Sequence, residues 1–335
     1  MVLVTGGTGL LGAHLLLHLL RKQVPVRAIH RKGSNLANVE KVFGYYNQED
    51  RELFHRVDWV VADLNDIPAL EKAFENIDFV YHAAALISFD PGNYRQLMKV
   101  NAEGTSNIVN LCIAHGVKKL CYASTIGTIG KSMNSASATE ENEWNDHRIN
   151  VYAQSKYAAE IEVWRGSQEG LPVVMVNPGV IIGPGFWNTG SGALFTTANK
   201  GYKYYPPGGT GFISVYDVVN IMVALMNSDI TNERFIAVAK NLSYMEVLTS
   251  VTHYLGRPKP TKKLDYWQLE VARIGDLILN FFTGKGRRIT RNSIYSMKHR
   301  DAYSNEKIKK ALNYEFEALE KSIAFSCKRF KEENL

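Results

Sequence analysis

Tyr152 and Lys156 are the two side chains of this sequence whose types and spacing best suit proton transfer. They lie four residues apart in the segment Tyr-Ala-Gln-Ser-Lys, and on a helix this spacing places both side chains on one face. A lysine ammonium beside a phenol stabilises the phenolate and lowers its pKa, which suits the phenol to general acid/base chemistry near neutral pH. A second tyrosine of the chain also has a lysine four residues on, so the spacing alone is weak evidence.

A pair of hydroxyl side chains, Ser124 and Thr125, directly follows the apolar run Leu120–Ala123. This run is typical of a buried strand, and ligands of α/β proteins bind beyond the carboxyl ends of strands. A hydroxyl at that place can donate a hydrogen bond to a substrate oxygen beside Tyr152. Without other motifs, a helix cap or a turn would explain the pair equally well.

The segment Thr-Gly-Gly-Thr-Gly-Leu-Leu-Gly at positions 5–12 predicts a dinucleotide-binding turn, because it follows a predicted strand and opens a predicted helix. Gly6 allows the tight turn, Gly9 lets the backbone approach a pyrophosphate, and Gly12 lets the helix pack close to the sheet. Free N–H groups at the start of the helix face the phosphates with a favourable dipole. The residues predicted to contact the cofactor here are Gly6, Thr8, Gly9, Leu10, Leu11 and Gly12.

Short apolar runs alternate with helical periods, and this alternation predicts an α/β fold with a doubly wound parallel sheet of the Rossmann type. The predicted strands are Val2–Thr5, Val24–Ile29, Trp59–Val61, Phe79–Tyr81, Leu120–Ala123, Val173–Asn177 and Phe235–Ala239. The predicted helices are Leu10–Lys22, Pro68–Glu75, Asn93–His115, Asn150–Gln168, Val215–Met226 and Tyr266–Phe282.

Two domains are expected from this pattern. Residues 1–180 with about 212–240 would form the dinucleotide-binding domain, and about 181–211 with 241–335 a smaller, mostly helical substrate-binding domain. Within the second domain, the glycine-rich stretch 179–211 is predicted to form loops, because it mixes Gly and Pro with aromatic residues.

Charge is unevenly distributed over the 335 residues, whose net charge is +6. From Arg257 to the C-terminus, 18 Lys and Arg stand against 10 Asp and Glu. No nucleic-acid-binding motif accompanies this excess, so a solvated face is the simplest interpretation, and peripheral contact with a membrane stays open. No apolar run reaches the ~18 residues of a spanning helix, and the first residues already predict a strand rather than a signal peptide. The three cysteines lack metal-ligand spacing, so we expect a soluble cytoplasmic protein with free thiols and no metal.

The motifs together resemble the extended short-chain dehydrogenase/reductases, a family of NAD(P)-dependent epimerases, dehydratases and reductases. The resemblance runs along nearly the whole chain and includes the glycine segment at 5–12, Asp63-Leu64, His82-Ala-Ala-Ala85, Asn101-Ala-Glu-Gly-Thr105, the Tyr152/Lys156 pair, Asn177-Pro178-Gly179 and Ser214-Val-Tyr-Asp217. Its nearest likeness is to dihydroflavonol-reductase-like and 3β-hydroxysteroid-dehydrogenase-like members.

The resemblance implies roles for further residues. It places Asp63 and Leu64 near the adenine, Ala83, Ala84 and Ala85 along the cofactor, and Pro178, Val180 and Ile181 near the nicotinamide carboxamide. It assigns the substrate-orienting hydroxyl to Thr125, with Ser124 as the neighbouring alternative. For Asn101 it implies helix distortion and water placement, and a plain polar helix residue is the other interpretation.

The sequence departs in two places from the members of this family that act on nucleotide sugars. Both departures favour a different class of substrate. Those enzymes carry an arginine that grips a diphosphate, where this chain reads Gly209-Thr210-Gly211-Phe212. The substrate loop instead contains Phe186, Trp187, Leu194, Phe195, Tyr202, Tyr204 and Tyr205. Such residues suit a pocket for a small apolar carbonyl or alcohol, although they would equally suit the core of the smaller domain.

The predicted second strand runs into His30-Arg31-Lys32, with no Asp or Glu before Glu40. An acid at that place would bond the ribose 2′-hydroxyl of NAD and repel a 2′-phosphate. Arg31 matches the arginine that grips this phosphate in similar reductases, and a guanidinium can bond it bidentately. We therefore expect NADP(H) as the preferred cofactor and NAD(H) as the alternative.

Three functions are compatible with these residues. The first is an oxidoreductase in which Thr125 orients the substrate oxygen, Tyr152 transfers its proton, and Lys156 holds the ribose. The others are a sugar epimerase or dehydratase with tightly held NAD, and a non-catalytic dinucleotide sensor. A homodimer is also expected, since the two longest central helices pair in the family. Their apolar residues beyond one sheet-facing stripe are Leu97, Ile108, Val109, Ile161 and Val163.

Overall fold

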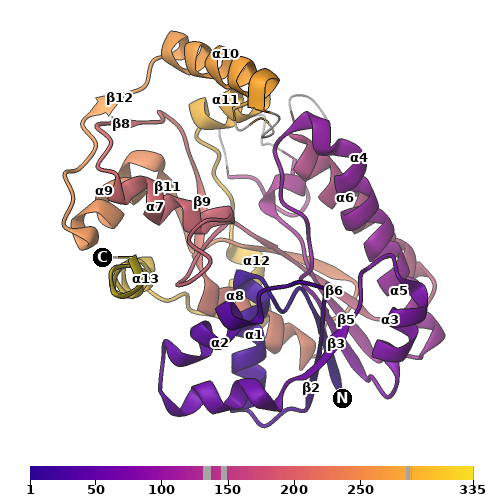
Figure 1. Ribbon diagram of the computed structural model, residues 1–335. Coiled ribbons are helices and arrows are strands. Elements are labelled where there is room, and N and C mark those ends of the chain that lie inside the picture. The colour runs from indigo at the N-terminus through magenta and orange to yellow at the C-terminus, as the bar shows by residue number, and fades with distance from the viewer. Residues whose placement is uncertain (131–136, 145–148, 284–286, 288, 335) are drawn as a thin grey trace.

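The seven predicted strands form one parallel sheet in the computed structural model, which describes residues 1–130, 137–144, 149–283, 287 and 289–334 (Figure 1). They are β1 (Val2–Thr5), β2 (Val26–His30), β3 (Asp58–Val61), β4 (Phe79–His82), β5 (Lys119–Ala123), β6 (Val173–Pro178) and β10 (Glu233–Ala237). Their order is β10-β6-β5-β4-β1-β2-β3, and every neighbouring pair is parallel. The chain order reverses between β1 and β4, and open sheets of this type bind ligands beyond the carboxyl ends of the strands at that point.

Helices cover both faces of this sheet and continue into the C-terminal region (Figure 1). They are α1 (Leu10–Arg21), α2 (Leu36–Gly44), α3 (Ile67–Phe74), α4 (Tyr94–Leu97), α5 (Gly104–Ala114), α6 (Val151–Gln168), α7 (Ala193–Asn199), α8 (Val215–Met226), α9 (Tyr244–Leu255), α10 (Tyr266–Thr283), α11 (Arg291–Lys298), α12 (Glu306–Leu312) and α13 (Leu319–Asn334). No helix was expected at α2, where the side chain of Asn35 caps the first turn.

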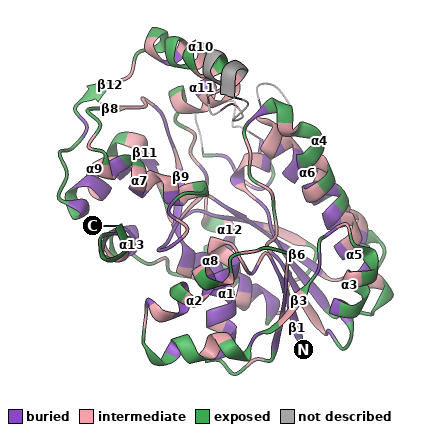
Figure 2. Ribbon diagram, viewed as in Figure 1, coloured by how far each residue is buried: buried purple, intermediate pink, exposed green. Residues whose placement is uncertain are grey.

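Alternating strand residues contribute to two hydrophobic cores, one on each face of the sheet. Val4 of β1 packs with α1 and α8, whereas Leu3 packs with α3, α5 and α6. Except for the edge strand β3, the strands are therefore largely buried on both faces, as the purple colour in Figure 2 shows, which explains why they are apolar runs in the sequence.

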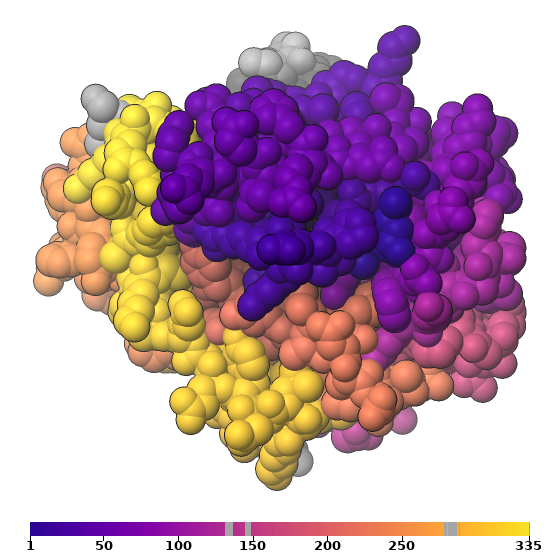
Figure 3. All heavy atoms as spheres, turned by 90° about the horizontal axis from the view of Figure 1, so that it is seen from below, coloured from indigo at the N-terminus to yellow at the C-terminus, as the bar shows by residue number. Residues whose placement is uncertain are grey.

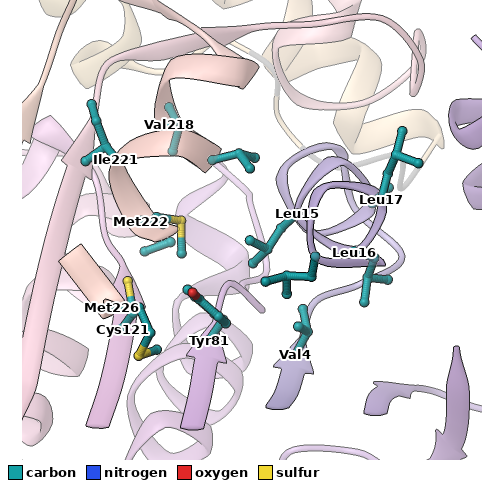
Figure 4. Close-up of a cluster of buried hydrophobic side chains, with 14 of the residues drawn as sticks. Val4, Leu15, Leu16, Leu17, Tyr81, Cys121, Val218, Ile221, Met222 and Met226 are labelled. Atoms are coloured by element: carbon teal, nitrogen blue, oxygen red, sulfur yellow. The ribbon is translucent and has the colours of Figure 1, made fainter. Parts of the chain in front are cut away.

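The C-terminal helix returns to the N-terminal half of the chain, and Figure 3 shows α13 in yellow beside the indigo and purple residues. The ring of Phe325 stacks on that of Tyr46 with 5.3 Å between centroids. Arg329 donates a hydrogen bond to the carbonyl of Tyr45. Beneath this contact, Leu15 of α1 and Met222 of α8 lie close to Tyr81 of the sheet (Figure 4).

The prediction that residues 179–211 form only loops is wrong. β7 (Val180–Ile182) pairs with β9 (Gly209–Ser214), which pairs with β11 (Lys240–Ser243), while β8 (Tyr204–Tyr205) pairs with β12 (Lys262–Lys263). Helix α7 also lies in this stretch. Its Phe195 is buried in one core with Val251 of α9 and Phe330 of α13, so contacts with distant residues stabilise it.

The predicted helix Asn93–His115 is divided by a π-helical turn, η3 (Met98–Glu103), between α4 and α5. The apolar excess assigned to a dimer contact is mostly used inside the protomer, because four of its five residues are fully buried: Leu97, Ile108, Val109 and Val163. Only Ile161 of that set is exposed, at 51%. The side chains of these two helices therefore give less support to a dimer than the sequence suggested.

The three cysteines Cys112, Cys121 and Cys327 are buried free thiols, as expected. Among the residues that the structure describes, no helix is long and apolar enough to cross a bilayer.

Candidate active site

The glycine turn between β1 and α1 leaves no room for side chains at two of its positions. Gly6 has a φ of 73°, and a Cβ there would lie 2.6 Å from the backbone of Ala83. A Cβ on Gly12 would lie 2.1 Å from the carbonyl oxygen of Gly6. At Gly9, by contrast, a Cβ would meet only that oxygen, at 3.5 Å, so this side of the turn is open.

The open side of the turn faces the start of α1, which suits an anion. Gly9 is the N-cap residue and offers no side-chain cap to the helix, and the first turn carries no acidic residue. The N–H groups of Leu10 and Leu11 therefore need acceptors from outside the helix, and the helix dipole favours a negative charge there. These residues, with half-buried Thr8 in the turn, fit the pyrophosphate of a dinucleotide.

The backbone of the segment after β4 passes directly against the glycine turn. Ala83 donates its N–H to the carbonyl of Thr5 at 3.3 Å, and Ala84 donates to the Thr5 hydroxyl at 3.2 Å. Ala85 follows as an exposed residue. The structure thus brings together two segments assigned to the cofactor, 77 residues apart.

Lys156 is buried in α6 and points at the end of β5. Its Nζ donates to the carbonyl of Ala123 at 2.8 Å and lies 4.2 Å from the centre of the Tyr122 ring. Burial lowers the pKa of Lys156 to about 7, while the Glu160 carboxylate acts in the opposite direction. The lysine is therefore held close to the strand end that carries the two candidate hydroxyls.

Tyr152 lies half-buried in the first turn of α6, which Asn150 caps by accepting from the N–H of Ala153. The Phe89 ring meets the Tyr152 ring edge-on at 5.9 Å. Burial raises the pKa of Tyr152 to about 12, which differs from the depression expected from Lys156. Burial is the cause of the increase, and the Nζ of Lys156 is directed to the carbonyl of Ala123; the phenol is protonated at neutral pH.

The two candidate hydroxyls differ in accessibility. Ser124 is buried, and its Oγ has no hydrogen-bond partner. Thr125 is half-buried, and its Oγ1 accepts from the N–H of Gly127 at 3.1 Å, which leaves its own O–H free to donate. A Cβ on Gly127 would lie 3.5 Å from Thr125 Oγ1 and 3.3 Å from the Cβ of Ala153, so this turn packs against the first turn of α6 at the residue after Tyr152.

Asn101 lies in the π-helical turn and is almost completely buried. Its amide exchanges two hydrogen bonds with the backbone of Leu86, at 2.7 and 3.0 Å. It also donates to Ser155 Oγ at 2.8 Å, and this hydroxyl in turn donates to the carbonyl of Tyr152. The distorted helix expected at Asn101 is present, and the side chain ties it to the first turn of α6.

His82 links the glycine turn to the hydrogen bonds around Asn101, and no role was predicted for this histidine. Its Nδ1 lies 2.6 Å from Thr5 Oγ1 and its Nε2 lies 2.9 Å from Thr105 Oγ1. Because Thr105 donates its proton to the carbonyl of Asn101, the Nε2 must be the nitrogen that carries hydrogen. Burial lowers the pKa of His82 to about 3, so the ring is neutral. Thr5 and His82 are paired in the register of β1 and β4, a neighbour relation that the sequence does not show.

A second buried group missed by the sequence analysis lies behind Lys156. Glu160 Oε1 accepts from Thr128 Oγ1 and from Asn177 Nδ2, both at 2.6 Å. Its Oε2 accepts no hydrogen bond, and the guanidinium of Arg234 lies 3.8 Å away. This carboxylate is the negative charge that opposes the loss of the Lys156 proton.

The adenine-side residues lie at the ends of β2 and β3. Arg31 is exposed directly after β2, and Glu40, the first acid beyond it, pairs with Arg51 at 2.8 Å. Asp63 is exposed after β3 and accepts from the N–H of Asn65 at 3.0 Å. Leu64 differs from them because its side chain is buried against Gly104.

The nicotinamide-side residues continue along the same edge of the sheet. Pro178 ends β6, and Val180 and Ile181 open β7. A Cβ on the following Gly183 would lie 2.6 Å from the side chain of Val215, which is too close. It would also lie 3.4 Å from the side chain of Leu10. This segment therefore passes the start of α1.

Four of the aromatic residues of the substrate loop fall into two groups, one buried and one exposed. Trp187 and Phe195 are buried in a core with Phe330, so they do not line a pocket. Tyr202 and Tyr204 are exposed on the surface. The apolar side chains beside Tyr152 come from another segment, after β4: Phe89, with exposed Ile87 two residues before it.

Comparison with known proteins identifies the family. The model of the NAD dependent epimerase/dehydratase family matches residues 2–238. The chain belongs to this family. Similar proteins include the sterol demethylase protein B of Methylococcus capsulatus, 28% identical over 265 residues that cover 77% of this chain and 75% of the relative. The putative dihydroflavonol 4-reductase of Synechocystis sp. is 30% identical over 273 residues, 79% of this chain and 75% of that protein.

Solved structures of the epimerase/dehydratase family share the fold. The structure of gox2253 matches 100% of this chain and 98% of its own with a TM-score of 0.81 at 24% identity. UDP-glucose 4-epimerase of Thermotoga maritima matches 99% of each chain with a TM-score of 0.76 at 19% identity. The chain is thus an NAD(P)-dependent enzyme of the extended short-chain dehydrogenase/reductase type.

Proposed function

We propose that this enzyme transfers a hydride between NADP(H) and a small apolar ketone or the corresponding secondary alcohol. The observation that carries the proposal is the position of Tyr152. It lies in the first turn of α6, next to the Ala153 against which the Thr125 turn packs, on the same helix as Lys156, and its ring meets the apolar Phe89 at 5.9 Å. The similarity to a dihydroflavonol reductase supports an oxygen-bearing ring substrate.

In this proposal the dinucleotide supplies or accepts the hydride, and the chain positions the substrate and moves its proton. The Thr125 hydroxyl donates to the substrate oxygen. The phenol of Tyr152, protonated at neutral pH, gives its proton to the same oxygen as a ketone is reduced. Lys156 holds the ribose, and the glycine turn holds the pyrophosphate.

The alternatives have less support from the site. A sugar-nucleotide epimerase or dehydratase needs a cation for the diphosphate, and the segment 209–212 in β9 carries none. A non-catalytic sensor needs neither the tyrosine nor the lysine, and this chain keeps both in one helix.

The direct test is a panel of flavonoid, steroid and smaller ring ketones incubated with the enzyme and NADPH, with a UDP-sugar as the comparison substrate. Loss of NADPH absorbance with a ring ketone is the expected result. Conversion of the UDP-sugar without net change in the cofactor, and no turnover of any ketone, would instead identify an epimerase.

Arg31→Asp is expected to reverse a preference for NADPH into one for NADH. The guanidinium would bond the 2′-phosphate, whereas a carboxylate repels it and accepts from a ribose hydroxyl. Loss of one charged hydrogen-bonding group corresponds to a roughly 10- to 100-fold weaker NADPH complex, measurable by fluorescence titration.

Arg56→Asp is the matched control for this change of charge. Arg56 is exposed and precedes β3, so it lies at the amino end of the strand, opposite the carboxyl ends where Arg31 lies. This variant should bind NADPH as the unmodified enzyme does. Equal or tighter binding of NADH than of NADPH by the unmodified enzyme contradicts the proposed preference.

The proposal also includes a division of the chain into two domains and a homodimer. Residues 1–180 with 212–240 would bind the dinucleotide and residues 181–211 with 241–335 the substrate, supported by the separate core that α7, α9 and α13 share. We also retain a homodimer through α5 and α6, which now rests on the family and on exposed Ile161.

A further inference from the structure

Helix α10 presents an apolar face to solvent at the periphery of the molecule (Figures 1 and 2). Trp267, Val271 and Ile274 are 64%, 59% and 47% exposed, and their spacing of four and three residues places them on one side. Leu277, one turn further, is 43% exposed. We call these four residues the α10 stripe. Contiguous exposed apolar residues of this kind mark an interaction site.

The opposite side of the same helix faces the protein. Leu269, two positions from Trp267 and from Val271, is only 4% exposed. Arg273 is largely buried and forms an ion pair with Glu270 at 2.7 Å. Over the part of α10 whose side chains the structure describes, the helix thus packs through a mixed side and directs aliphatic residues outward, the reverse of a helix that covers a core.

Basic residues are concentrated in the segment of the sequence that contains the stripe. Between positions 257 and 300 the sequence holds 11 Lys and Arg against 3 Asp and Glu, so this segment alone carries +8 while the whole chain carries +6. Exposed Lys262 and Lys263 of β12 directly precede α10, and the Nζ of Lys298 lies 4.2 Å from the centre of the Tyr266 ring. An apolar stripe with a tryptophan, rimmed by lysines and tyrosines, is the pattern of a helix that lies in a membrane interface.

We propose that α10 docks the enzyme onto an anionic lipid bilayer, with the α10 stripe in the headgroup and acyl boundary and the surrounding lysines on the lipid phosphates. A second copy fits less well, because a symmetric contact would place two segments of +8 against each other. Single-stranded nucleic acid fits less well because the aliphatic residues Val271, Ile274 and Leu277 offer no ring on which bases stack.

Residues that follow α10 along the chain contact segments next to the candidate active site. The N–H of Arg287, just after α10, donates to Asp90 at 2.7 Å, and Asp90 follows the Phe89 that contacts Tyr152. Asn292 of α11 donates to the carbonyl of Ile149, directly before the cap of α6, also at 2.7 Å. An apolar substrate dissolved in the bilayer would therefore leave it near Tyr152, a consequence that rests on the proposed function, whereas docking itself does not.

The test is sedimentation of the full chain with vesicles of phosphatidylcholine alone and of phosphatidylcholine mixed with phosphatidylglycerol. Binding is expected only to the anionic vesicles and should weaken with rising salt. The double variant Val271→Glu/Ile274→Glu should bind at least about tenfold more weakly, because two apolar side chains no longer insert. Val61→Glu, at a residue of β3 that is 56% exposed, is the matched control and should bind normally.

A second measurement does not depend on the folding of a charged variant. Lipids with a quencher in the acyl chain should quench tryptophan emission of the unmodified protein, and the conservative Trp267→Phe should lose that quenching while still sedimenting with vesicles. Neither experiment needs cofactor or substrate, so failure of the proposed reaction leaves the outcome interpretable. The proposal is overturned by equal sedimentation with and without anionic lipid, by normal binding of the double variant, by a dimer that the double variant dissociates, or by preferential binding of an oligonucleotide.

Discussion

Replacing Tyr152 with phenylalanine is expected to lower turnover of a ketone substrate by ~100-fold or more, the scale of a lost acid/base group, with dinucleotide binding nearly unchanged. The ring would remain packed against Phe89, so the apolar surroundings and the first turn of α6 are preserved. Only the hydroxyl is removed, and that hydroxyl is protonated at neutral pH because burial raises its pKa to about 12. The loss should therefore appear in kcat rather than in KM.

Tyr157→Phe provides the control on the same helix. Its ring stacks on Trp144 with 4.0 Å between centroids, and it stands five residues beyond Tyr152, outside the proposed site. This variant should keep its full turnover. Full turnover by Tyr152→Phe as well would exclude the phenol as the proton donor and with it the mechanism proposed above.

Gly12→Ala is expected to destabilise the fold by about 3 kcal/mol and to abolish dinucleotide binding, the larger structural effect among these substitutions. The new Cβ would lie 2.1 Å from the carbonyl oxygen of Gly6 and 2.8 Å from the Cα of Gly7. Both obstacles are backbone atoms, which cannot rotate away as a side chain could. Either α1 must move from the sheet or the turn must open, and urea unfolding measures the cost.

Gly9→Ala is expected to abolish cofactor binding while leaving the stability of the fold nearly unchanged. A Cβ at Gly9 meets only the Gly6 oxygen, at 3.5 Å, which is ordinary contact, so the free energy of unfolding should change by roughly 1 kcal/mol or less. The same atom would enter the space assigned to the pyrophosphate, so NADPH binding should be lost. A Gly9→Ala protein that binds NADPH as tightly as the unmodified one would show that the phosphates lie elsewhere.

The strands and the cofactor turn were predictable because their signals are local. A buried parallel strand must be apolar on both faces, so runs such as Val173–Asn177 stand out without knowledge of their neighbours. Gly12 of the turn is required by backbone atoms of Gly6 and Gly7, which lie only a few residues away. Errors in the fold arose where distant residues decide, as in α7, which is stabilised by α9 and α13 rather than by its own glycine-rich sequence.

In the candidate site, too, features set by local sequence were predictable and those set by distant residues were not. That the Thr125 turn and the first turn of α6 pack together followed from strand ends and helix spacing, since the carboxyl ends of parallel strands share an edge. The direction of the Tyr152 pKa shift did not follow, because it depends on where the Lys156 ammonium points and on how deeply α6 is buried. The link through His82 was also hidden, because its partners Thr5 and Thr105 lie 77 and 23 residues away.

The sequence by itself thus determined the parallel sheet, the glycine turn between β1 and α1 and the presence of a hydroxyl, a phenol and a lysine after it, since each depends on periodicity or short spacing. The tertiary structure alone decided the rest. It placed Trp187 and Phe195 in a core, buried Val163 within the protomer and left the α10 stripe in solvent. An apolar residue lowers the free energy equally in a core, a pocket or an interface, and only the packing of distant segments selects among them.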